Sequence, residues 1–362
     1  MRKHLLVGAL AVLAALILVQ GVTAAQTYTF VTAWGERGSG NGQFTYPWGV
    51  ARDASGNIYV TDSYNDRVQK FDSGGTFLTT WGSTGSGNGQ FSDPSGIAVD
   101  TAGNVYVSDT GNHRVEKFDS SGNFLTAWGS QGSANGQFFF PFGIATDASG
   151  DVFVVDYGNC RIEKFDGTGT FLAAWGGFGY GAGQLYYPIG IGADAAGNVY
   201  VSDTNNNRIQ KFDGDGNFLT AWGSAGSGDG QFNTPYGVAA DTAGNVYVAD
   251  EGNSRIEKFD SAGTFLTSWG VYGTDPGQLR YPTAVVTAGA GIVYVADYNN
   301  DRIEEFALGC MADSDCGDGQ VCSTGSCTSG TAVPVPEFPT VAVPVAILGV
   351  TALAALVVRK KL

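Results

Sequence analysis

Three polar residues recur at one fixed spacing, and a single copy of them would look catalytic. An Asp, an Asn three positions later and an Arg two positions after that return every 47 residues. Because the set appears six times, we interpret it as structural: an ion pair with hydrogen bonds that fixes a loop in each copy. The Asp–Arg pairs are Asp62 and Arg67, Asp109 and Arg114, Asp156 and Arg161, Asp203 and Arg208, Asp250 and Arg255, and Asp297 and Arg302.

Other signs of catalysis are weak. His113 is the only histidine after residue 25, which rules out a zinc site with several histidine ligands. No G-x-S-x-G nucleophile motif is present. The string 213–217 (DGDGN) hints at a calcium loop but lacks the Glu twelve positions along, and it aligns with an ordinary turn of the repeat. We therefore predict no catalytic residue, no metal ligand and no cofactor.

Residues that differ between the copies are better candidates for binding. Each copy holds a Pro, from Pro47 to Pro282, and aromatic residues flank many of these prolines. Aromatic groups on rigid loops can stack on sugars or receive peptide side chains, although they can equally pack within the fold. Tyr64, Tyr157 and Tyr298 come from a second loop of the repeat. The candidate ligand-binding residues are Tyr46, Trp48, Phe139, Phe140, Phe142, Tyr186, Tyr187, Tyr236, Tyr281, His113 and Arg280.

The elements that carry these residues follow from the 47-residue repeat. In the second copy, residues 96–99, 105–108, 114–118 and 124–128 alternate or concentrate β-forming residues. The segments 100–104 and 119–123 read Asp-x-x-Gly-Asn, which is typical of tight turns. Four strands per copy, with turn signals about every ten residues, indicate antiparallel β-structure. The many turns also explain the 55 glycines.

Six such units predict an all-β fold, a six-bladed β-propeller over residues 26–308 with four-stranded antiparallel blades. Residues 28–34 match a fourth strand with nothing before them, and residues 283–306 supply three strands without a fourth. The N-terminal strand should therefore complete the last blade and remove a free sheet edge. The loops between blades and those between the second and third strands should open on one face, around a central pit.

The repeat resembles the NHL-repeat family. In the second copy the resemblance lies in 96–100 (GIAVD), 103–107 (GNVYV) and 109–118 (DTGNHRVEKF). It covers about residues 28–306, and it implies a six-bladed propeller used mostly for binding. The sixth copy departs from the pattern with Ala284, Ala288 and Ile292, so its inner hairpin is expected to be irregular.

Four cysteines crowd into a C-terminal segment, residues 309–328. Cys310, Cys316, Cys322 and Cys327 predict two disulfides if the segment is extracellular, with three pairings available and zinc binding as the alternative. By resemblance to short cysteine-rich knots of secreted proteins, the pairing Cys310–Cys322 with Cys316–Cys327 is favoured. Cys160 occupies a variable slot of the repeat and is expected to be an unpaired loop residue.

The two ends of the chain predict a cell-surface protein. Residues 1–25 have a positive start, an apolar stretch and small residues before a cleavage point, which is typical of a secretory signal; an uncleaved anchor is the alternative. A Pro-rich linker (329–340) leads to an apolar run (341–358) and a basic cytoplasmic tail (359–362). Such a run is long enough to span a bilayer, with the basic tail inside and the propeller outside.

Residues 336–340 (PEFPT), the apolar run and the basic tail resemble the PEF-type C-terminal sorting signal of archaeal surface proteins. The resemblance implies that an archaeosortase-like enzyme removes the tail and attaches the protein to a lipid. A plain transmembrane anchor is the alternative.

The formal net charge is −15, so nucleic acid is a poor candidate partner. We expect a monomeric propeller that binds a surface protein or a glycan on its loop face. The alternatives are a structural role in the cell envelope and, third, a lyase or hydrolase with a metal in the central channel.

Overall fold

The computed structural model describes residues 27–289 and 291–309, and the backbone of 320–323 and 326–329. The predicted signal segment (1–25) and the sorting motif, apolar run and tail (336–362) lie outside the described residues. Within the described part of the chain, no helix is long and apolar enough to cross a membrane.

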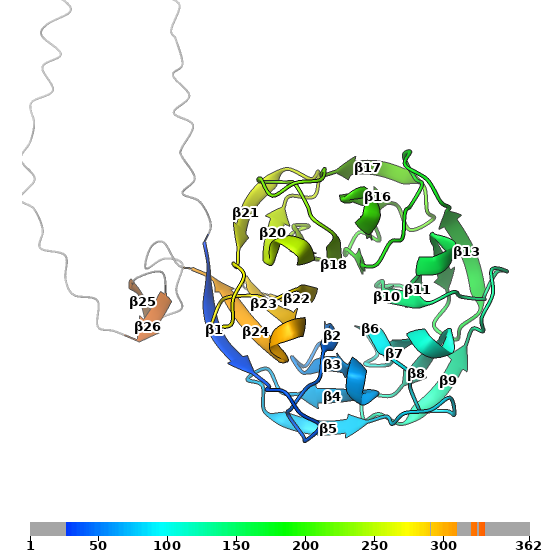
Figure 1. Cartoon of the computed structure of the whole chain (residues 1–362), viewed down its shortest axis with the longest axis horizontal. Coiled ribbons are helices and arrows are strands. Elements are labelled where there is room, and N and C mark those ends of the chain that lie inside the picture. The colour runs from blue at the N-terminus through cyan, green and yellow to red at the C-terminus, as the bar shows by residue number, and fades with distance from the viewer. Residues whose placement is uncertain (1–26, 290, 310–319, 324–325, 330–362) are drawn as a thin grey trace, which may run out of the picture. The chain divides into compact units, whose positions relative to one another are not determined.

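Residues 27–309 form six four-stranded antiparallel sheets arranged as blades around a central axis (Figure 1), which confirms the predicted propeller. The first strands, nearest the axis, are β2 (Pro47–Arg52), β6 (Pro94–Val99), β10 (Pro141–Thr146), β14 (Ile191–Ala193), β18 (Pro235–Ala240) and β22 (Pro282–Ala288). The second strands are β3 (Ile58–Asp62), β7 (Val105–Asp109), β11 (Val152–Asp156), β15 (Val199–Asp203), β19 (Val246–Asp250) and β23 (Ile292–Asp297).

A one-turn 3-10 helix joins the second strand of each blade to the third. These helices are η1 (Ser63–Asn65), η2 (Thr110–Asn112), η3 (Tyr157–Asn159), η4 (Thr204–Asn206), η5 (Glu251–Asn253) and η6 (Tyr298–Asn300). The third strands are β4 (Arg67–Phe71), β8 (Arg114–Phe118), β12 (Arg161–Phe165), β16 (Arg208–Phe212), β20 (Arg255–Phe259) and β24 (Arg302–Leu308). The outer strands are β5 (Phe77–Trp81), β9 (Phe124–Trp128), β13 (Phe171–Gly176), β17 (Phe218–Trp222), β21 (Phe265–Trp269) and, from the N-terminus, β1 (Tyr28–Trp34).

Strand β1 closes the ring, as predicted. It pairs with β24 in the order β1-β24-β23-β22, so the last blade combines both ends of the propeller. Its first residue, Tyr28, stacks on Trp269 of the preceding blade with ring centroids 4.0 Å apart. The Tyr28 hydroxyl also lies 2.9 Å from the hydroxyl of Tyr247. Ring closure is therefore held by backbone pairing and by an aromatic contact between blades five and six.

The Asp-x-x-Gly-Asn segments are tight turns whose first residue holds the backbone. The Oδ1 atom of Asp100 accepts hydrogen bonds from the backbone N–H groups of Ala102 and Asn104, at 2.9 and 2.8 Å. Gly103 adopts the left-handed conformation (φ 85°) that the turn requires. The same bonds recur in the outer turn around Asp119.

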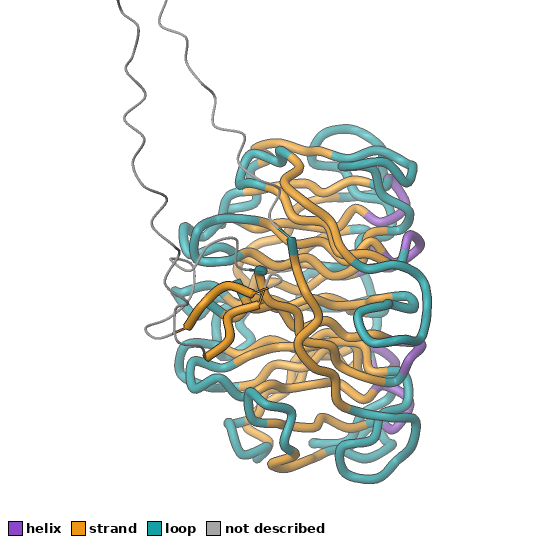
Figure 2. The backbone as a smooth tube through the Cα atoms, turned by 90° about the vertical axis from the view of Figure 1, so that its left-hand side faces the viewer, coloured by secondary structure: helices purple, strands orange, loops and turns teal. Residues whose placement is uncertain are grey.

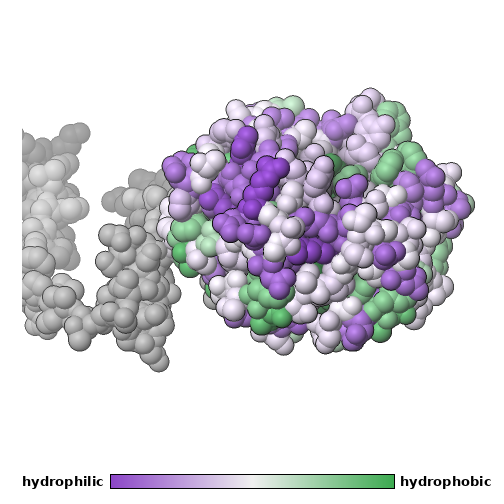
Figure 3. Space-filling model, turned by 60° about the horizontal axis from the view of Figure 1, so that its bottom comes forward, coloured by the Kyte–Doolittle hydropathy of each residue, from purple (hydrophilic) through white to green (hydrophobic). Residues whose placement is uncertain are grey.

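The hydrophobic core lies between adjacent blades rather than within one of them. The layer between the first two blades contains Tyr59 and Val68 from one blade and Ile97, Val107 and Phe118 from the other, all buried. Since a blade alone leaves both faces uncovered, the ring is the smallest unit that buries them. On the side shown in Figure 3, hydrophobic residues form separate patches on a largely polar surface.

The sixth blade differs from our expectation. Its inner hairpin pairs residue by residue from Ala284 to Ala288, a longer continuous ladder than in the second blade. The prediction of an irregular inner hairpin was therefore wrong for its paired residues. At the replaced positions the ladder gains the pairs Ala284–Ala296 and Ala288–Ile292, which the second blade lacks. Separately, β25 (Gln320–Ser323) and β26 (Ser326–Ser329) form a hairpin in which Cys322 is the backbone partner of Cys327. Cys310 and Cys316 lie outside the described residues, so the two disulfides stay a prediction.

Candidate functional site

The variable residues gather on one face of the propeller, here called the loop face. It consists of the connections between blades, each ending at the repeated Pro (residue 47, 94, 141, 188, 235 or 282), and of the six 3-10 helices. Figure 2 shows these helices together on one side of the ring, with the tight turns on the other. The loop face therefore presents two loops from every blade.

The repeated Asp, Asn and Arg fix these loops from within. The buried carboxylate of Asp109 accepts hydrogen bonds from the Ser92 backbone N–H at 2.8 Å, from Asn112 Nδ2 at 2.8 Å and from Arg114 Nε at 2.7 Å. The Arg114 guanidinium also donates to the carbonyl oxygens of Ser86, Gly87 and Gln90. One charge pair thus ties the loop between blades to the strand pair beneath it.

Every blade has the same pair, with the Arg Nε between 2.7 and 2.9 Å from the Asp Oδ2. Burial outweighs these bonds and raises the pKa of Asp109 above its usual range. In every blade the Asp carboxylate accepts hydrogen bonds from the side-chain N–H groups of both the Asn and the Arg. The pairs are Asp62 and Arg67, Asp109 and Arg114, Asp156 and Arg161, Asp203 and Arg208, Asp250 and Arg255, and Asp297 and Arg302.

A buried slot beside this network holds Gln in two blades and Glu in four. Gln69 accepts a hydrogen bond from the Gly42 N–H at 2.9 Å and donates to the Gln43 carbonyl at 2.7 Å. In other blades Glu116, Glu163, Glu257 and Glu304 take this slot, each paired with the Arg of its blade. Burial is the main cause that raises their pKa values, to about 7 for three of them and to about 8 for Glu257.

A second repeated contact links each blade to the next. The residue before each Pro is left-handed (φ 47° to 60°), and so is the residue after each 3-10 helix. At four of the contacts between neighbouring blades, the backbone N–H of the residue before the Pro donates a hydrogen bond. The acceptor is the side chain of the residue that follows the 3-10 helix of the preceding blade. The donor and acceptor pairs are Tyr46 with Asp301, Asp93 with Asp66, Phe140 with His113, and Thr234 with Asn207.

His113 and Cys160 both occupy this slot between blades. The Nδ1 atom of His113 accepts the Phe140 N–H at 3.0 Å, and its ring stacks on Phe139, 5.7 Å between centroids. Burial lowers the pKa of His113, which keeps the accepting, neutral form. Cys160 is a free, buried thiol whose pKa burial raises. A structural contact thus accounts for a histidine that sequence reasoning assigned to ligand binding.

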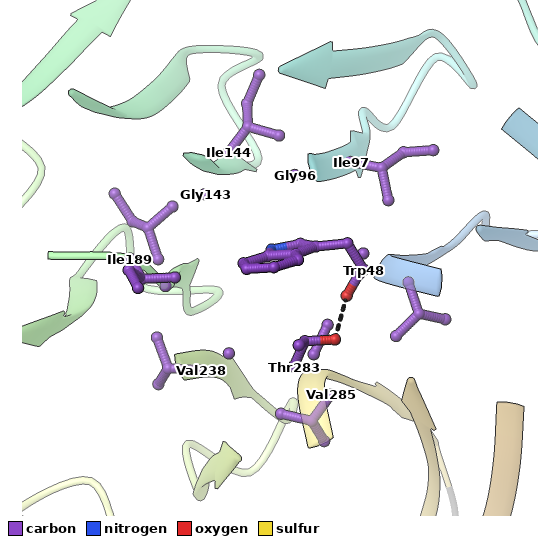
Figure 4. Close-up of a pocket in the computed structure, with 15 residues that line it drawn as sticks. Trp48, Gly96, Ile97, Gly143, Ile144, Ile189, Val238, Thr283 and Val285 are labelled. Carbon is purple, nitrogen blue, oxygen red and sulfur yellow. Dashed lines mark hydrogen bonds between the residues drawn. The ribbon is translucent and has the colours of Figure 1, made fainter. Parts of the chain in front are cut away.

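The residue after each Pro alternates in size around the ring. Large aromatic residues stand in blades one, three and five, whereas blades two, four and six have smaller residues. In this position the chain holds Trp48, Ser95, Phe142, Ile189, Tyr236 and Thr283. The Trp48 ring lies 5.4 Å from Phe142 and 5.7 Å from Tyr236, although these residues belong to non-adjacent blades. Figure 4 shows its indole reaching across the middle of the ring.

The indole of Trp48 therefore lies over the narrow central channel. A cavity of about 70 Å³ there is lined by Trp48 and by glycine, valine, isoleucine, alanine and threonine residues of the first strands. The Trp48 carbonyl accepts a hydrogen bond from Thr283 Oγ1 at 2.7 Å. In the described part of the chain, no three His, Cys, Asp or Glu side chains gather as metal ligands would.

A larger pocket opens beside Trp48 on the loop face, with a volume of about 320 Å³. Residues of four blades line it, and we call it the aromatic pocket. Its rings contact one another: Tyr46 stacks on Tyr298 at 4.9 Å and lies 5.8 Å from Tyr64. Its lining consists of Tyr46, Trp48, Ser63, Tyr64, Asp93, Ser95, Thr110, Gly111, Phe140, Phe142 and Tyr298.

Four of the eleven predicted binding residues line this pocket: Tyr46, Trp48, Phe140 and Phe142. Others form neighbouring groups. Tyr186 contacts Tyr187, which stacks on Tyr157 at 4.8 Å, and Tyr157 in turn lies 5.0 Å from Phe142. Tyr281 and Arg280 lie apart from the pocket and contact Tyr272.

Two charged residues at the pocket were missed. Asp93 lines it, in the slot that Tyr or Phe fills in four other blades. The Arg37 guanidinium lies 5.5 Å from the Tyr46 ring centroid. The sequence did contain a signal for Asp93, because a charged residue stands there at a position that is aromatic in most copies. No such signal pointed to Arg37.

Comparisons with known proteins agree with this architecture. The profile described as NHL repeat matches residues 44–71, 91–118, 185–212 and 232–259, which are the first, second, fourth and fifth copies. No curated protein matches the sequence.

Many solved structures are similar. A structural genomics protein of unknown function from Bacteroides thetaiotaomicron has a TM-score of 0.58 and 21% identity, over 78% of this chain and 76% of that one. A gluconolactonase from Xanthomonas campestris has a TM-score of 0.56 and 15% identity, over 79% and 99% of the two chains. Virginiamycin B lyase from Staphylococcus aureus has 0.51 and 13%, over 78% and 99%.

At these identities the likeness concerns the fold alone. The four matched repeats contain the Asp, Asn and Arg that fix the loop face, and the third and sixth copies hold the same residues. The chain is thus a six-bladed β-propeller that contains NHL repeats.

Proposed function

We propose that the chain is a binding module that recognises its partner on the loop face, at the aromatic pocket. One observation carries the proposal: residues that differ between the copies converge there, while the repeated residues around them are occupied by structural contacts. Tyr64 has 71% of its surface exposed and Phe140 has 38%, so their rings are available to a ligand. Exposed aromatic groups on a rigid support are common anchors of binding energy.

The proposed partner is a surface protein or a glycan, met outside the cell by a monomeric propeller that is anchored at its C-terminus. The N-terminal signal pattern, the apolar run at 341–358 and the PEF-like motif support this location. Processing by an archaeosortase-like enzyme belongs to the same proposal. The intact mass of the protein isolated from its own cells tests it: a retained segment 341–362 would contradict removal of the tail and leave a plain anchor.

A matched pair of variants tests the loop face. The full-length protein is screened against glycans and against proteins of the cell surface, beside a Tyr46→Ala/Tyr64→Ala variant and a Tyr281→Ala variant. Tyr281 fills the same left-handed slot as Tyr46 (φ 57° and 60°) but lies outside the pocket. A ligand lost by the first variant and kept by the second supports the proposal. Equal binding by all three folded proteins would move the site elsewhere.

One observation favours a structural role as a second candidate. Each outer strand exposes one aliphatic side chain at the same register, and each of these is 40% to 49% exposed. They form a ring around the rim: Val31, Leu78, Leu125, Leu172, Leu219 and Leu266. Lateral packing of rims would bury these residues, so concentration-dependent assembly that a Leu78→Lys/Leu125→Lys variant abolishes would support an envelope component.

A further inference from the structure

The aromatic pocket carries negative charge next to its rings. Among the described residues that line it, Asp93 alone is charged. The Asp93 backbone N–H donates to Asp66 Oδ1 at 2.9 Å, which brings two carboxylate residues together. Burial and the Asp66 charge raise the pKa of Asp93. A cation at this point would relieve the repulsion between the two carboxylates.

The protein itself does not neutralise this pair. Within residues 27–289 and 291–309, no ion pair joins Asp66 or Asp93 to a Lys, Arg or His side chain. Further acids stand close by. Burial is the main cause that raises the pKa of Tyr298, and the charges of Asp93, Asp301 and Glu251 contribute to the shift. Three acidic residues therefore lie near Tyr298, whereas Arg37 brings one positive charge to the edge of the pocket, over Tyr46.

The aromatic rings suit a cation for a separate reason. The face of a phenol or indole ring is negatively polarised and attracts an ammonium or guanidinium group within about 6 Å of its centroid. Arg37 already makes such a contact at the edge of the pocket, over Tyr46. Trp48, Tyr64 and Tyr298 add three further electron-rich rings to the lining.

The aliphatic hydroxyl groups of the pocket are engaged within the protein. Ser63 Oγ donates to the Pro94 carbonyl, Ser95 and Thr110 bond to each other, and Thr110 Oγ1 donates to the Pro141 carbonyl. The side-chain polar groups left for a ligand are the Asp93 carboxylate, the phenol hydroxyls and the indole N–H of Trp48. A cation, unlike a neutral sugar, also offsets the charge of the neighbouring Asp66 and Asp93 carboxylates.

We propose that the aromatic pocket binds a cationic side chain, a lysine ammonium or an arginine guanidinium, presented by a protein partner. The inference rests on the proposed function of the loop face and narrows it to one chemistry. Asp93 supplies the charge, while Tyr46, Trp48, Tyr64 and Tyr298 surround the cation. The apolar stem of the side chain packs against Phe140 and Phe142.

Small probes test the chemistry without knowledge of the partner. The full-length protein is titrated with N-acetyl-lysine methylamide, N-acetyl-arginine methylamide and the uncharged N-acetyl-norleucine methylamide, with binding followed by calorimetry or NMR. We expect the two cations to bind and the norleucine probe to bind at least about tenfold more weakly. Equal binding of the charged and uncharged probes, or binding of none of them, would overturn the proposal.

Two variants separate local charge from the overall acidity of the protein. Asp93→Asn keeps a side chain that tolerates the left-handed backbone (φ 49°) and should weaken the cationic probes roughly tenfold. Asp215→Asn removes one charge from an exposed tight turn and should leave binding unchanged. An equal loss in both variants would attribute binding to net charge and contradict the assigned site.

The two proposals fail in different ways. A partner that is lost by Tyr46→Ala/Tyr64→Ala but kept by Asp93→Asn contradicts the cation and leaves the loop face as the binding surface. A glycan partner that behaves this way has the same consequence. A partner kept by both variants contradicts the loop face itself.

Discussion

The two faces of the propeller are built from the same repeat but use it differently. The turn face is the side of the ring opposite the loop face. There, Asp-x-x-Gly turns recur in the inner and outer hairpins with one pattern of hydrogen bonds, as at Asp100 and Asp119. On the loop face, equivalent positions hold different residues, such as Trp48, Ser95 and Phe142. Residues that are the same in every copy thus make the hydrogen bonds that complete the fold, whereas the side chains of the variable residues are left for other contacts.

The largest expected effect comes from breaking the uniform part of the loop face. Asp109→Ala should lower the free energy of unfolding by about 3–5 kcal/mol, because three hydrogen-bond donors, one of them the Arg114 guanidinium, lose a buried partner. Tyr64→Ala, at an exposed and variable position, should stay within about 0.5 kcal/mol of the wild type. Urea denaturation measures both. Similar losses in the two variants would refute the division between repeated and variable residues.

The turn face can be broken at a glycine. A Cβ atom on Gly122 (φ +86°) would lie 2.5 Å from Cδ2 of Trp81 in the neighbouring blade. Gly122→Ala should therefore cost about 2–4 kcal/mol, from backbone strain and displacement of the indole. Gly150 has the same φ and no atom within 4 Å of such a Cβ, so Gly150→Ala isolates the strain, about 1–2 kcal/mol. If both variants lose the same stability, the Trp81 contact contributes nothing.

The buried position that holds Gln in two blades and Glu in four allows the blades to be compared by changing the pH. The pKa of Glu257 is raised to about 8 from an unfolded value of 4.5, so the folded protein binds the additional proton. This contribution to stability is full below about pH 4.5 and is lost as the pH rises through about 8. Glu257→Gln supplies the residue that Gln69 and Gln210 provide in other blades. We expect its melting temperature to exceed that of the wild type by about 3 °C at pH 8.5.

At pH 4.5 the difference between these two proteins should be much smaller than at pH 8.5. Thermal denaturation followed by circular dichroism at the two pH values gives the answer. A Glu257→Gln variant that is less stable at both would show that the carboxylate stabilises the folded protein as an ion-pair partner of Arg255.

The smallest expected effect concerns the joint at His113. Its pKa is lowered in the folded protein, so its contribution to stability is full above about pH 6.5 and is lost as the pH falls through the folded pKa. Protonated Nδ1 can no longer accept the Phe140 N–H. His113→Asn restores the acceptor that Asn207 provides in another joint. As the pH falls from 7.5 to 5.5, the free energy of unfolding of the variant should rise relative to that of the wild type. The change should be less than about 1 kcal/mol.

The fold was predictable because the 47-residue spacing repeats both the strands and the turns, and because Tyr28–Trp34 supplied the missing strand of the last blade. The aromatic pocket was predictable only in part. Tyr46 and Tyr281 occupy the same position of the repeat, yet only Tyr46 lines the pocket. Which variable residues meet depends on the sizes of side chains in other blades, as where Trp48 reaches Phe142 and Tyr236.

The buried Glu slot was missed for a different reason. The pattern of residues 114–118 predicts a strand but gives no measure of how deeply the Glu116 carboxylate is buried. The register in which Asp109 lies opposite Arg114 sets that environment. The environment of the Glu carboxylate also depends on the loop between blades, whose course the sequence does not specify.

The closure of the ring by β1 has a mechanical consequence. Strand β24 is flanked by β23 and β1, and the Gly309 N–H at its end donates to the Thr27 carbonyl at 2.7 Å. A force that pulls the chain at Gly309 along the strand would load two ladders of hydrogen bonds in shear, all at once. Unzipping a free outer strand would instead break them one at a time. The same seam that closes the propeller therefore makes its C-terminal end the mechanically resistant point from which it can be held.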